Sequence, residues 1–115
     1  MKIKYQICLS LLLVLGWASV AHAKLNIVAT TPDLGAIARE IGKDKVEVTS
    51  IAKPTEDPHF VDAKPSFIVK LNKADMLIDG GLHLEIGWLP NLVTGARNQK
   101  ILPGNPGYLV ASAGI

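Results

Sequence analysis

The sequence predicts an α/β domain in which helices flank a parallel β-sheet. Short apolar runs of strand length alternate with stretches of helical periodicity between residues 25 and 111. The first strand, the first helix and the second strand together occupy about thirty residues, the usual size of a right-handed crossover unit between parallel strands. No internal repeat, low-complexity segment or interdomain linker interrupts the chain. We therefore expect a single small domain in residues 24–115.

The first strand is predicted in residues 25–30, which are mostly apolar. A helix then begins at Pro32, with Thr31 as its cap, because proline suits the first helical position and threonine suits the position before it. Gly42 supplies the stop of this helix, and residues 45–51 form the second strand. Four apolar residues recur at helical spacing and predict the buried face of the helix: Leu34, Ile37, Ala38 and Ile41.

The second half of the domain repeats this alternation. Residues 64–72 predict a helix that opens on Lys-Pro-Ser, and residues 76–78 are a continuous apolar run, as expected of an interior parallel strand. A further helix is predicted in residues 84–96, a short strand in residues 100–102 and a last apolar strand in residues 108–111. The second helix presents three apolar residues to the core: Phe67, Ile68 and Leu71.

Residues 1–23 have the pattern of a secretory signal peptide. Two lysines give a positive start, residues 7–20 are almost uncharged, and Ala21-His22-Ala23 is the small-x-small pattern that signal peptidase accepts. We expect cleavage after Ala23, a periplasmic location and no stable membrane anchor afterwards. The alternative is an uncleaved anchor, since residues 5–23 are nearly long enough to span a bilayer.

The only cysteine of the chain, Cys8, lies inside this leader and before most of its apolar run. A lipidated cysteine would follow the apolar run, so we expect Cys8 to leave with the leader. The mature part then has no disulfide and must depend on its core, which favours the periplasm over an outer surface. The net charge is +2 and no basic run is long, so nucleic acid is not an expected partner.

Three turns are expected to share one edge of the sheet, in residues 31–33, 56–59 and 79–83. Each follows a predicted strand, and ligands of open α/β sheets bind at the carboxyl ends of the strands. This edge therefore brings His59, His83 and several carboxylates within reach of one another.

His59 is the candidate metal ligand. It lies in the stretch Glu56-Asp57-Pro58-His59-Phe60, where a proline stiffens the backbone and carboxylates surround the imidazole. Such an imidazole suits a borderline cation such as zinc, and Asp57 or Asp62 is placed to orient its ring. The alternative is an ordinary surface histidine in a polar turn.

His83 is the weaker candidate. It is expected at the entry of the helix in residues 84–96, where the positive end of the helix dipole disfavours a cation. Its apolar neighbours Leu82 and Leu84 favour a packed or capping role instead.

We expect no enzyme. The chain has no His-Glu-x-x-His spacing, no Gly-x-Ser-x-Gly and no phosphate-binding glycine loop. The adjacent acids Glu56 and Asp57 are more typical of solvated side chains than of a catalytic pair. The alternative in this class is a small secreted metalloenzyme that uses His59, His83 and Glu85.

Several motifs together resemble the cluster A-I metal-binding proteins, the zinc and manganese solute-binding proteins of bacterial ABC transporters, of the ZnuA and TroA type. These motifs are Ile27-Val28-Ala29-Thr30-Thr31-Pro32, Glu56-Asp57-Pro58-His59, Lys64-Pro65-Ser66, Lys73-Ala74-Asp75-Met76-Leu77 and Gly81-Leu82-His83-Leu84-Glu85. The resemblance implies a bilobed α/β protein that carries Zn²⁺ or Mn²⁺ between its lobes and delivers it to an ABC permease in the inner membrane. It makes His59 the first metal ligand and gives His83 no such role.

The resemblance also implies parts that these 115 residues do not include. A second histidine, two ligands from the other lobe and the long linking helix would follow Ile115, and no histidine-rich loop is present. We therefore expect a truncated N-terminal lobe that binds metal weakly or not at all, because zinc takes about four ligands. A non-functional fragment is the remaining alternative.

Overall fold

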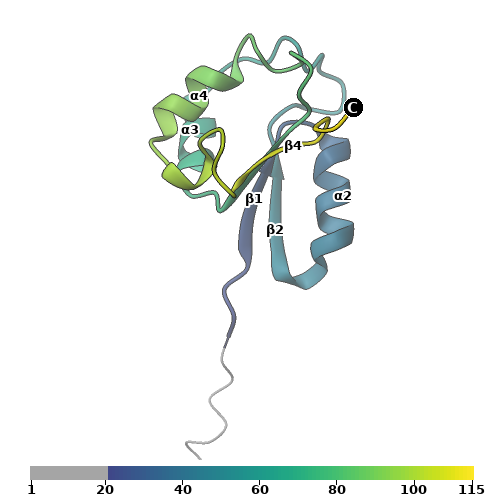
Figure 1. Cartoon of the computed structure of the whole chain (residues 1–115), viewed down its shortest axis with the longest axis vertical. Coiled ribbons are helices and arrows are strands. Elements are labelled where there is room, and N and C mark those ends of the chain that lie inside the picture. The colour runs from purple at the N-terminus through teal and green to yellow at the C-terminus, as the bar shows by residue number, and fades with distance from the viewer. Residues whose placement is uncertain (1–20) are drawn as a thin grey trace, which may run out of the picture.

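A four-stranded, all-parallel sheet forms the centre of the computed structural model, which describes residues 21–115 (Figure 1). The strands are β1 (Leu25–Ala29), β2 (Val46–Ser50), β3 (Met76–Asp79) and β4 (Tyr108–Val110), in the order β2-β1-β3-β4. The predictions for the charged start of the leader, its apolar run and Cys8 lie outside the described residues. The predicted parallel α/β sheet is confirmed.

Three α-helices and two 3₁₀ turns connect these strands. The helices are α2 (Pro32–Gly42), α3 (Pro65–Asn72) and α4 (Leu89–Ala96), and the 3₁₀ turns are η1 (Lys43–Lys45) and η2 (Gln99–Ile101). Each α-helix has proline in its first turn, where the missing N–H costs no intrahelical hydrogen bond. Among residues 21–115, none of the helices combines the length and the apolarity needed to cross a bilayer.

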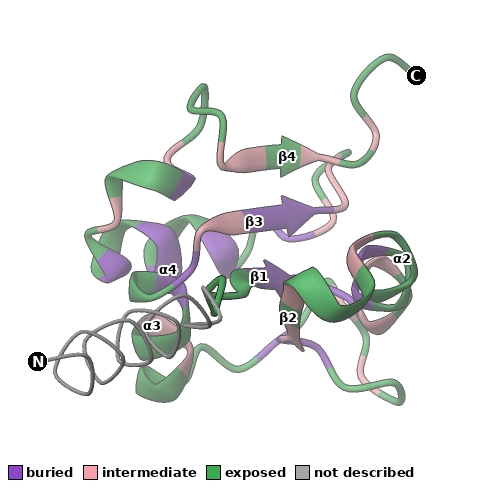
Figure 2. Cartoon of the chain, turned by 90° about the horizontal axis from the view of Figure 1, so that it is seen from below, coloured by how far each residue is buried: buried purple, intermediate pink, exposed green. Residues whose placement is uncertain are grey.

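The two faces of the sheet carry cores of unequal size. Helices α3 and α4 pack on one face, and α2 packs on the other (Figures 1 and 2). The α3–α4 side holds the larger core, in which Val28 and Leu77 of the sheet meet Leu71 of α3 and Leu92 of α4. The α2 side holds a small core of buried residues: Ile27, Ala29, Ala38 and Ile78. Side chains alternate between the faces along each strand, which is why β1 contributes to both cores.

Helix α2 meets the sheet through small residues, and this differs from the prediction. Gly35 and Ala38 are buried, whereas Ile37 is 56% exposed and Ile41 is 80% exposed. A Cβ at Gly35 would collide with the Ser50 hydroxyl, so the helix lies too close to β2 for a larger side chain there. The expectation that Ile37 and Ile41 are buried is therefore wrong in the described structure.

The helix predicted for residues 84–96 begins only at Leu89. Residues 82–88 form consecutive turns, and Leu82 and His83 have φ values of 53° and 65°, which a right-handed helix cannot include. Pro90 then sets the first turn of the helix. The predicted strand in residues 100–102 is also wrong, because this stretch lies in and after the 3₁₀ turn η2.

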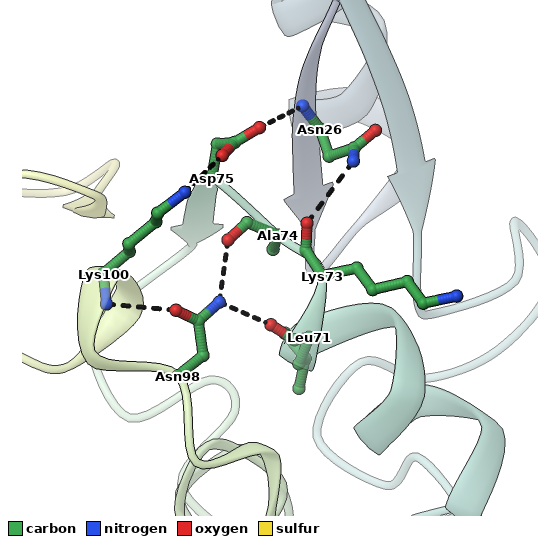
Figure 3. A network of polar contacts seen from close by, with 7 residues as sticks. All are labelled: Asn26, Leu71, Lys73, Ala74, Asp75, Asn98 and Lys100. Atoms are coloured by element: carbon green, nitrogen blue, oxygen red, sulfur yellow. Dashed lines mark hydrogen bonds and ion pairs between the residues drawn. The ribbon is translucent and has the colours of Figure 1, made fainter.

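Asn98 connects three elements at the amino-terminal edge of the sheet (Figure 3). Its Nδ2 donates to the carbonyl oxygens of Leu71 at 2.9 Å and Ala74 at 2.7 Å, at the end of α3 and just after it. Its Oδ1 accepts from the backbone N–H of Lys100 at 3.1 Å and so starts η2. Asn98 explains why residues 100–102 turn instead of extending.

Asp75 completes this network at the start of β3 (Figure 3). Its carboxylate accepts from Lys100 Nζ at 2.8 Å and from the backbone N–H of Asn26 at 2.9 Å. The pKa of Asp75 lies below its usual value, first because of Lys100 and then because of the Asn26 N–H. Through these two bonds, Asp75 connects the start of β1 and the start of β3 to η2, which precedes β4.

We predict that Asn98→Ala lowers the free energy of unfolding by about 1–3 kcal/mol, because two inward-facing carbonyl groups lose their donor. Urea denaturation followed by circular dichroism measures this change. Asn91→Ala is the control, since Asn91 is exposed on α4 and should shift stability by no more than about 0.5 kcal/mol. Equal urea midpoints for Asn98→Ala and the parent chain would contradict the prediction.

Candidate functional site

The carboxyl ends of all four strands meet at one edge of the sheet, here called the rim (Figure 1). A hollow of about 600 Å³ opens there, and parts of all three predicted turns line it. Its lining includes Thr31 and Asp33 from the first turn, Glu56 and Pro58 from the second, and Gly80 from the third. The expectation that these turns gather at one edge of the sheet is confirmed.

The acidic turn, residues 56–60, is held by short-range hydrogen bonds. The Glu56 N–H donates to the Lys53 carbonyl and the Lys53 N–H donates to the Glu56 carboxylate, both at 3.1 Å. The Phe60 N–H donates to the Asp57 carbonyl at 3.0 Å, with Pro58 between them. These contacts make two successive tight turns without a helix or strand, and Pro58 limits the backbone to few conformations.

The imidazole of His59 is oriented by Asp57. Nδ1 of His59 lies 2.8 Å from Asp57 Oδ1, and the same oxygen accepts from the His59 backbone N–H at 2.9 Å. Of the two acids considered from the sequence, Asp57 has this role, because Asp62 makes no hydrogen bond to the ring in the described structure. The pKa of Asp57 lies below its usual value, first because of the His59 backbone N–H and then because of the ring.

The ring of His59 is accessible. Its side chain is 58% exposed, and the nearest aromatic ring, that of Phe60, has its centroid 6.2 Å away. The lining of the rim hollow includes Pro58 but not His59, so the imidazole lies beside the hollow rather than inside it. Solvent therefore reaches the His59 side chain.

Trp88 anchors the acidic turn to the larger core, a role that the sequence analysis missed. Its indole Nε1–H donates to the Pro58 carbonyl at 2.8 Å, and the residue is only 3% exposed. A tryptophan directly before Leu-Pro at a helix start was the available sign, since a buried indole N–H needs an acceptor. The acceptor is the carbonyl immediately before His59, so the larger core fixes the position of the His59 backbone.

His83 lies in a different place. It is exposed, and it lines a separate hollow of about 200 Å³ together with Asp79, Glu85 and Tyr108. Its backbone belongs to the turns of residues 82–88 rather than to a helix entry, so the predicted dipole effect and the predicted packing are both wrong. His59 does not line this hollow, and the three residues of the metalloenzyme alternative are not gathered there.

Glu85 is committed to the framework. It is 3% exposed, and its Oε1 accepts from the Thr30 hydroxyl at 2.5 Å and from the Gly80 N–H at 2.7 Å. Thr30 follows β1 and Gly80 follows β3, so this carboxylate joins the ends of the two central strands. Nearby, the Tyr108 hydroxyl donates to Asp79, and the pKa of Tyr108 is raised by burial and then by Asp79.

The donor set of the rim is small. Within residues 21–115 there is no group of three or more His, Cys, Asp or Glu side chains that could hold a metal ion. One oriented imidazole can supply a single strong bond, whereas zinc prefers four ligands. By itself the arrangement offers one imidazole that a metal could bind and no complete metal site within residues 21–115.

Comparison with known proteins identifies the family. Residues 27–113 match the family model described as "Zinc-uptake complex component A periplasmic". The chain belongs to this family. A curated relative, the manganese ABC transporter substrate-binding lipoprotein ScaA of Streptococcus gordonii, is 33% identical over 98 residues, which are 83% of this chain and 30% of the relative. The chain thus spans about a third of that relative's length.

Solved structures show the same fold. The periplasmic zinc-binding protein TroA of Treponema pallidum matches at 25% identity with a TM-score of 0.60, over 67% of this chain and 27% of that one. The manganese-bound periplasmic metal-binding protein of Candidatus Liberibacter asiaticus has a TM-score of 0.65 at 24% identity, over 80% of this chain and 32% of its own. The expected resemblance is confirmed. The curated relative is named as a substrate-binding protein, which agrees with the expectation of no enzyme.

We predict that Trp88→Phe loosens the acidic turn. Phenylalanine keeps an apolar ring in the core but leaves the Pro58 carbonyl without its donor, so we expect a loss of about 1 kcal/mol in unfolding free energy. The amide of Phe60 should exchange its hydrogen faster, as measured by NMR. Thr94→Val is the control, because it removes an exposed side-chain hydrogen bond within α4. An unchanged Phe60 amide in Trp88→Phe would rule out the anchoring role.

We predict that His59→Ala raises the pKa of Asp57 only part of the way to its usual value. The ring is lost, but the backbone N–H at residue 59, the larger cause of the depression, remains. Because the pKa is depressed, the contact stabilises the turn at neutral pH and is lost as the pH falls below about 4. Carboxyl ¹³C shifts measured against pH test this, with His83→Ala as the control that leaves Asp57 unchanged.

Proposed function

We propose that this chain is the N-terminal α/β lobe of a bilobed substrate-binding protein that captures a divalent transition metal for ABC-type import. Family membership supports the class of protein. Residues 24–115 would be the lobe, and residues 1–23 a signal peptide that directs it to the periplasm. The described residues that bear on the metal are those of the acidic turn.

The observation that carries the proposal is the contact between His59 Nδ1 and Asp57. An Nδ1–H that donates to a carboxylate leaves the lone pair of Nε2 free for a metal and makes the imidazole a better ligand. The exposure of the ring lets an ion reach it. In this proposal His59 is a metal ligand, and Asp57 is a positioning residue that acts through it.

The ligand count implies that other segments complete the site. His59 would supply one bond, and the described residues hold no group of three or more possible ligands. A metal held between two lobes would take its remaining ligands from outside this lobe's acidic turn. The 115-residue chain alone should then bind the ion weakly or not at all.

Zinc is the proposed cargo, with manganese as the second candidate. Imidazole nitrogen suits zinc well, whereas an oxygen-rich ligand set would favour manganese. The relatives point in both directions, since TroA is named as a zinc-binding protein and the Streptococcus gordonii relative as a manganese transporter component. The proposed macromolecular partner is the permease of the same ABC transporter, reached by the loaded protein.

A secreted metalloenzyme is less well supported. The carboxylate of Glu85 is buried and bonded to Thr30 and Gly80, and His59 does not line the hollow that His83 and Glu85 share. The carboxylate beside His59, that of Asp57, already engages Nδ1 of the ring. The remaining alternative, a fragment without function, predicts no effect of His59 in any context.

A family-length hybrid tests the proposal. Residues 27–113 of this chain replace the matching stretch of the Streptococcus gordonii relative, and zinc and manganese are titrated in by calorimetry. His59→Ala should weaken binding by at least about 100-fold and Asp57→Asn by about tenfold, since changes to residues that orient a ligand already cost about 10–100-fold. His83→Ala is the control and should leave the affinity unchanged.

The 115-residue chain is titrated in parallel. We expect no binding tighter than the micromolar range, because a single imidazole supplies too few bonds. Submicromolar binding with one ion per chain would contradict the shared site, and equal affinities for the hybrid and its His59→Ala variant would remove His59 from it.

A further inference from the structure

The edge of the sheet opposite the rim, where the strands begin, is here called the basic edge. Lys24 lies directly before β1 and Lys45 directly before β2. Lys73 lies three residues before β3, and Lys100 contacts Asp75 at the start of the same strand. Because all four strands are parallel, their starts lie at one edge, and these four lysines gather there.

Three more cations reach this edge from the connections between the strands. Lys43 lies in η1, Lys70 in the last turn of α3, and Arg97 directly after α4. Each helix runs back against the strands, so its carboxyl end lies where the next strand begins. All seven basic residues of this edge are exposed.

Charge is unevenly distributed between the two edges of the sheet. Residues 24–115 carry ten Lys or Arg and ten Asp or Glu, because Lys2 and Lys4 are the other two cations of the chain. The basic edge has seven of these cations and four of the acids, Glu40, Asp44, Glu47 and Asp75, which gives a net charge of +3. The remainder, which includes the rim, therefore has a net charge of −3.

Most cations of the basic edge are available to a partner. Within residues 21–115, two of them form ion pairs, Lys43 with Glu40 at 3.2 Å and Lys100 with Asp75 at 2.8 Å. Figure 3 shows that the side chain of Lys73 points away from the polar network of its neighbours. The edge therefore presents charge that its own acids do not neutralise.

Helix dipoles explain part of this pattern. The carboxyl ends of α2, α3 and α4 lie at the basic edge, and a cation stabilises the carboxyl end of a helix. Lys24 precedes a strand instead of ending a helix, and Lys45 lies beyond the end of α2. The dipoles therefore do not account for the whole charge of the edge.

The leader joins the lobe at the basic edge. β1 begins at Leu25, so only Lys24 separates the strand from residues 1–23. One residue spans at most about 3.6 Å. Residues 5–23 are nearly long enough to span a bilayer. Whenever the leader lies in a membrane, the starts of the strands are therefore brought next to the lipid headgroups.

We propose that the basic edge lies on the anionic phospholipid headgroups of the membrane that the leader enters, with the acidic rim facing the solution. Each lysine near an anionic bilayer changes partitioning by about fivefold, so a net charge of +3 gives a weak and reversible contact. The inference rests on the proposed function for the export of the chain. It adds a second surface, at the end of the lobe opposite His59, and turns the metal ligand toward incoming ions.

A nucleic acid fits the basic edge less well. Sites for single strands combine a basic groove with aromatic side chains on which the bases stack. Lys70 and Lys73 line a hollow of about 150 Å³ at this edge, but its lining, all from described residues, includes Glu47 and no aromatic side chain. A flat anionic surface matches cations that are spread over four connections.

Fluorescence quenching by a lipid with a nitroxide headgroup measures which edge faces the membrane. In a Cys8→Ser background, the 115-residue chain carries a fluorophore at Gln99→Cys on the basic edge or at Thr55→Cys beside the rim, both exposed positions. The vesicles contain equal parts of phosphatidylglycerol and phosphatidylcholine, or phosphatidylcholine alone. We expect quenching at residue 99 to be at least about threefold stronger in the anionic vesicles, and quenching at residue 55 to be equal in both.

Two matched double variants assign the effect. Lys70→Gln with Lys73→Gln removes two cations from the basic edge, and Lys53→Gln with Lys64→Gln removes two from elsewhere in the lobe. The leader is the same in both. The first pair should shift the equilibrium between bound and free edge at least about tenfold toward the free state, whereas the second should leave it unchanged. Sodium chloride at about 1 M should also release the edge, because it shortens the screening length to about 3 Å.

Equal quenching of residue 99 in the two kinds of vesicle would overturn the proposal, and so would equal effects of the two double variants. Stronger quenching at residue 55 than at residue 99 would place the acidic rim on the membrane and would also overturn it. Loss of quenching on addition of an equimolar DNA oligonucleotide would assign the edge to nucleic acid instead.

A replacement variant and a separate titration complete the test. If circular dichroism shows that Lys70→Gln with Lys73→Gln is unfolded, Lys43→Gln with Lys45→Gln takes its place, with the same expected release. Metal titration of the hybrid defined above is done without lipid. Failure of the metal proposal and failure of the membrane contact are therefore distinguishable results.

Discussion

The hydrogen bond from the Trp88 indole to the Pro58 carbonyl is the contact on which the candidate site depends. The acidic turn contains no helix or strand, and its other hydrogen bonds are local. Only this bond joins the backbone of residues 56–60 to a side chain of the larger core, where Trp88 is buried. Because His59 follows the bonded carbonyl directly, the core determines the position of an imidazole that is itself exposed.

The carboxylates near the rim have two different roles, and burial separates them. Glu85 is buried and accepts from Thr30 and Gly80, so the charge-assisted hydrogen bonds offset the cost of removing its charge from water. Asp57 is exposed and can orient a histidine without that cost. The buried Glu85 therefore holds the strand ends together, whereas the exposed Asp57 orients the imidazole of His59.

Leu34 connects the rim to the smaller core. It lines the rim hollow and also packs, partly buried, against the core on the α2 side of the sheet. The larger core lies on the other face, where α3 and α4 cover the sheet. The rim hollow itself is lined by the start of α2 and by segments that follow β2, β3 and β4, so both sides of β1 contribute to it.

Local patterning was enough to predict most of the fold. The parallel sheet, the starts of α2 and α3 and the position of β3 follow from apolar periodicity and from prolines in first turns, which act over a few residues. The acidic turn was also found from its composition, although the sequence left Asp57 and Asp62 as equal candidates to orient His59. His59 as a metal ligand remains a prediction.

The order of the elements and the chemical character of the turns follow from the amino-acid sequence, because hydrophobic periodicity and proline geometry are local properties. The positive φ angles of Leu82 and His83, which delay α4, had no sign in the local pattern. The close approach of α2 to β2 at Gly35 and the bond from Trp88 to the turn before His59 come from tertiary packing, because they join groups from separate parts of the chain. Their distances are set by packing, which no local pattern records.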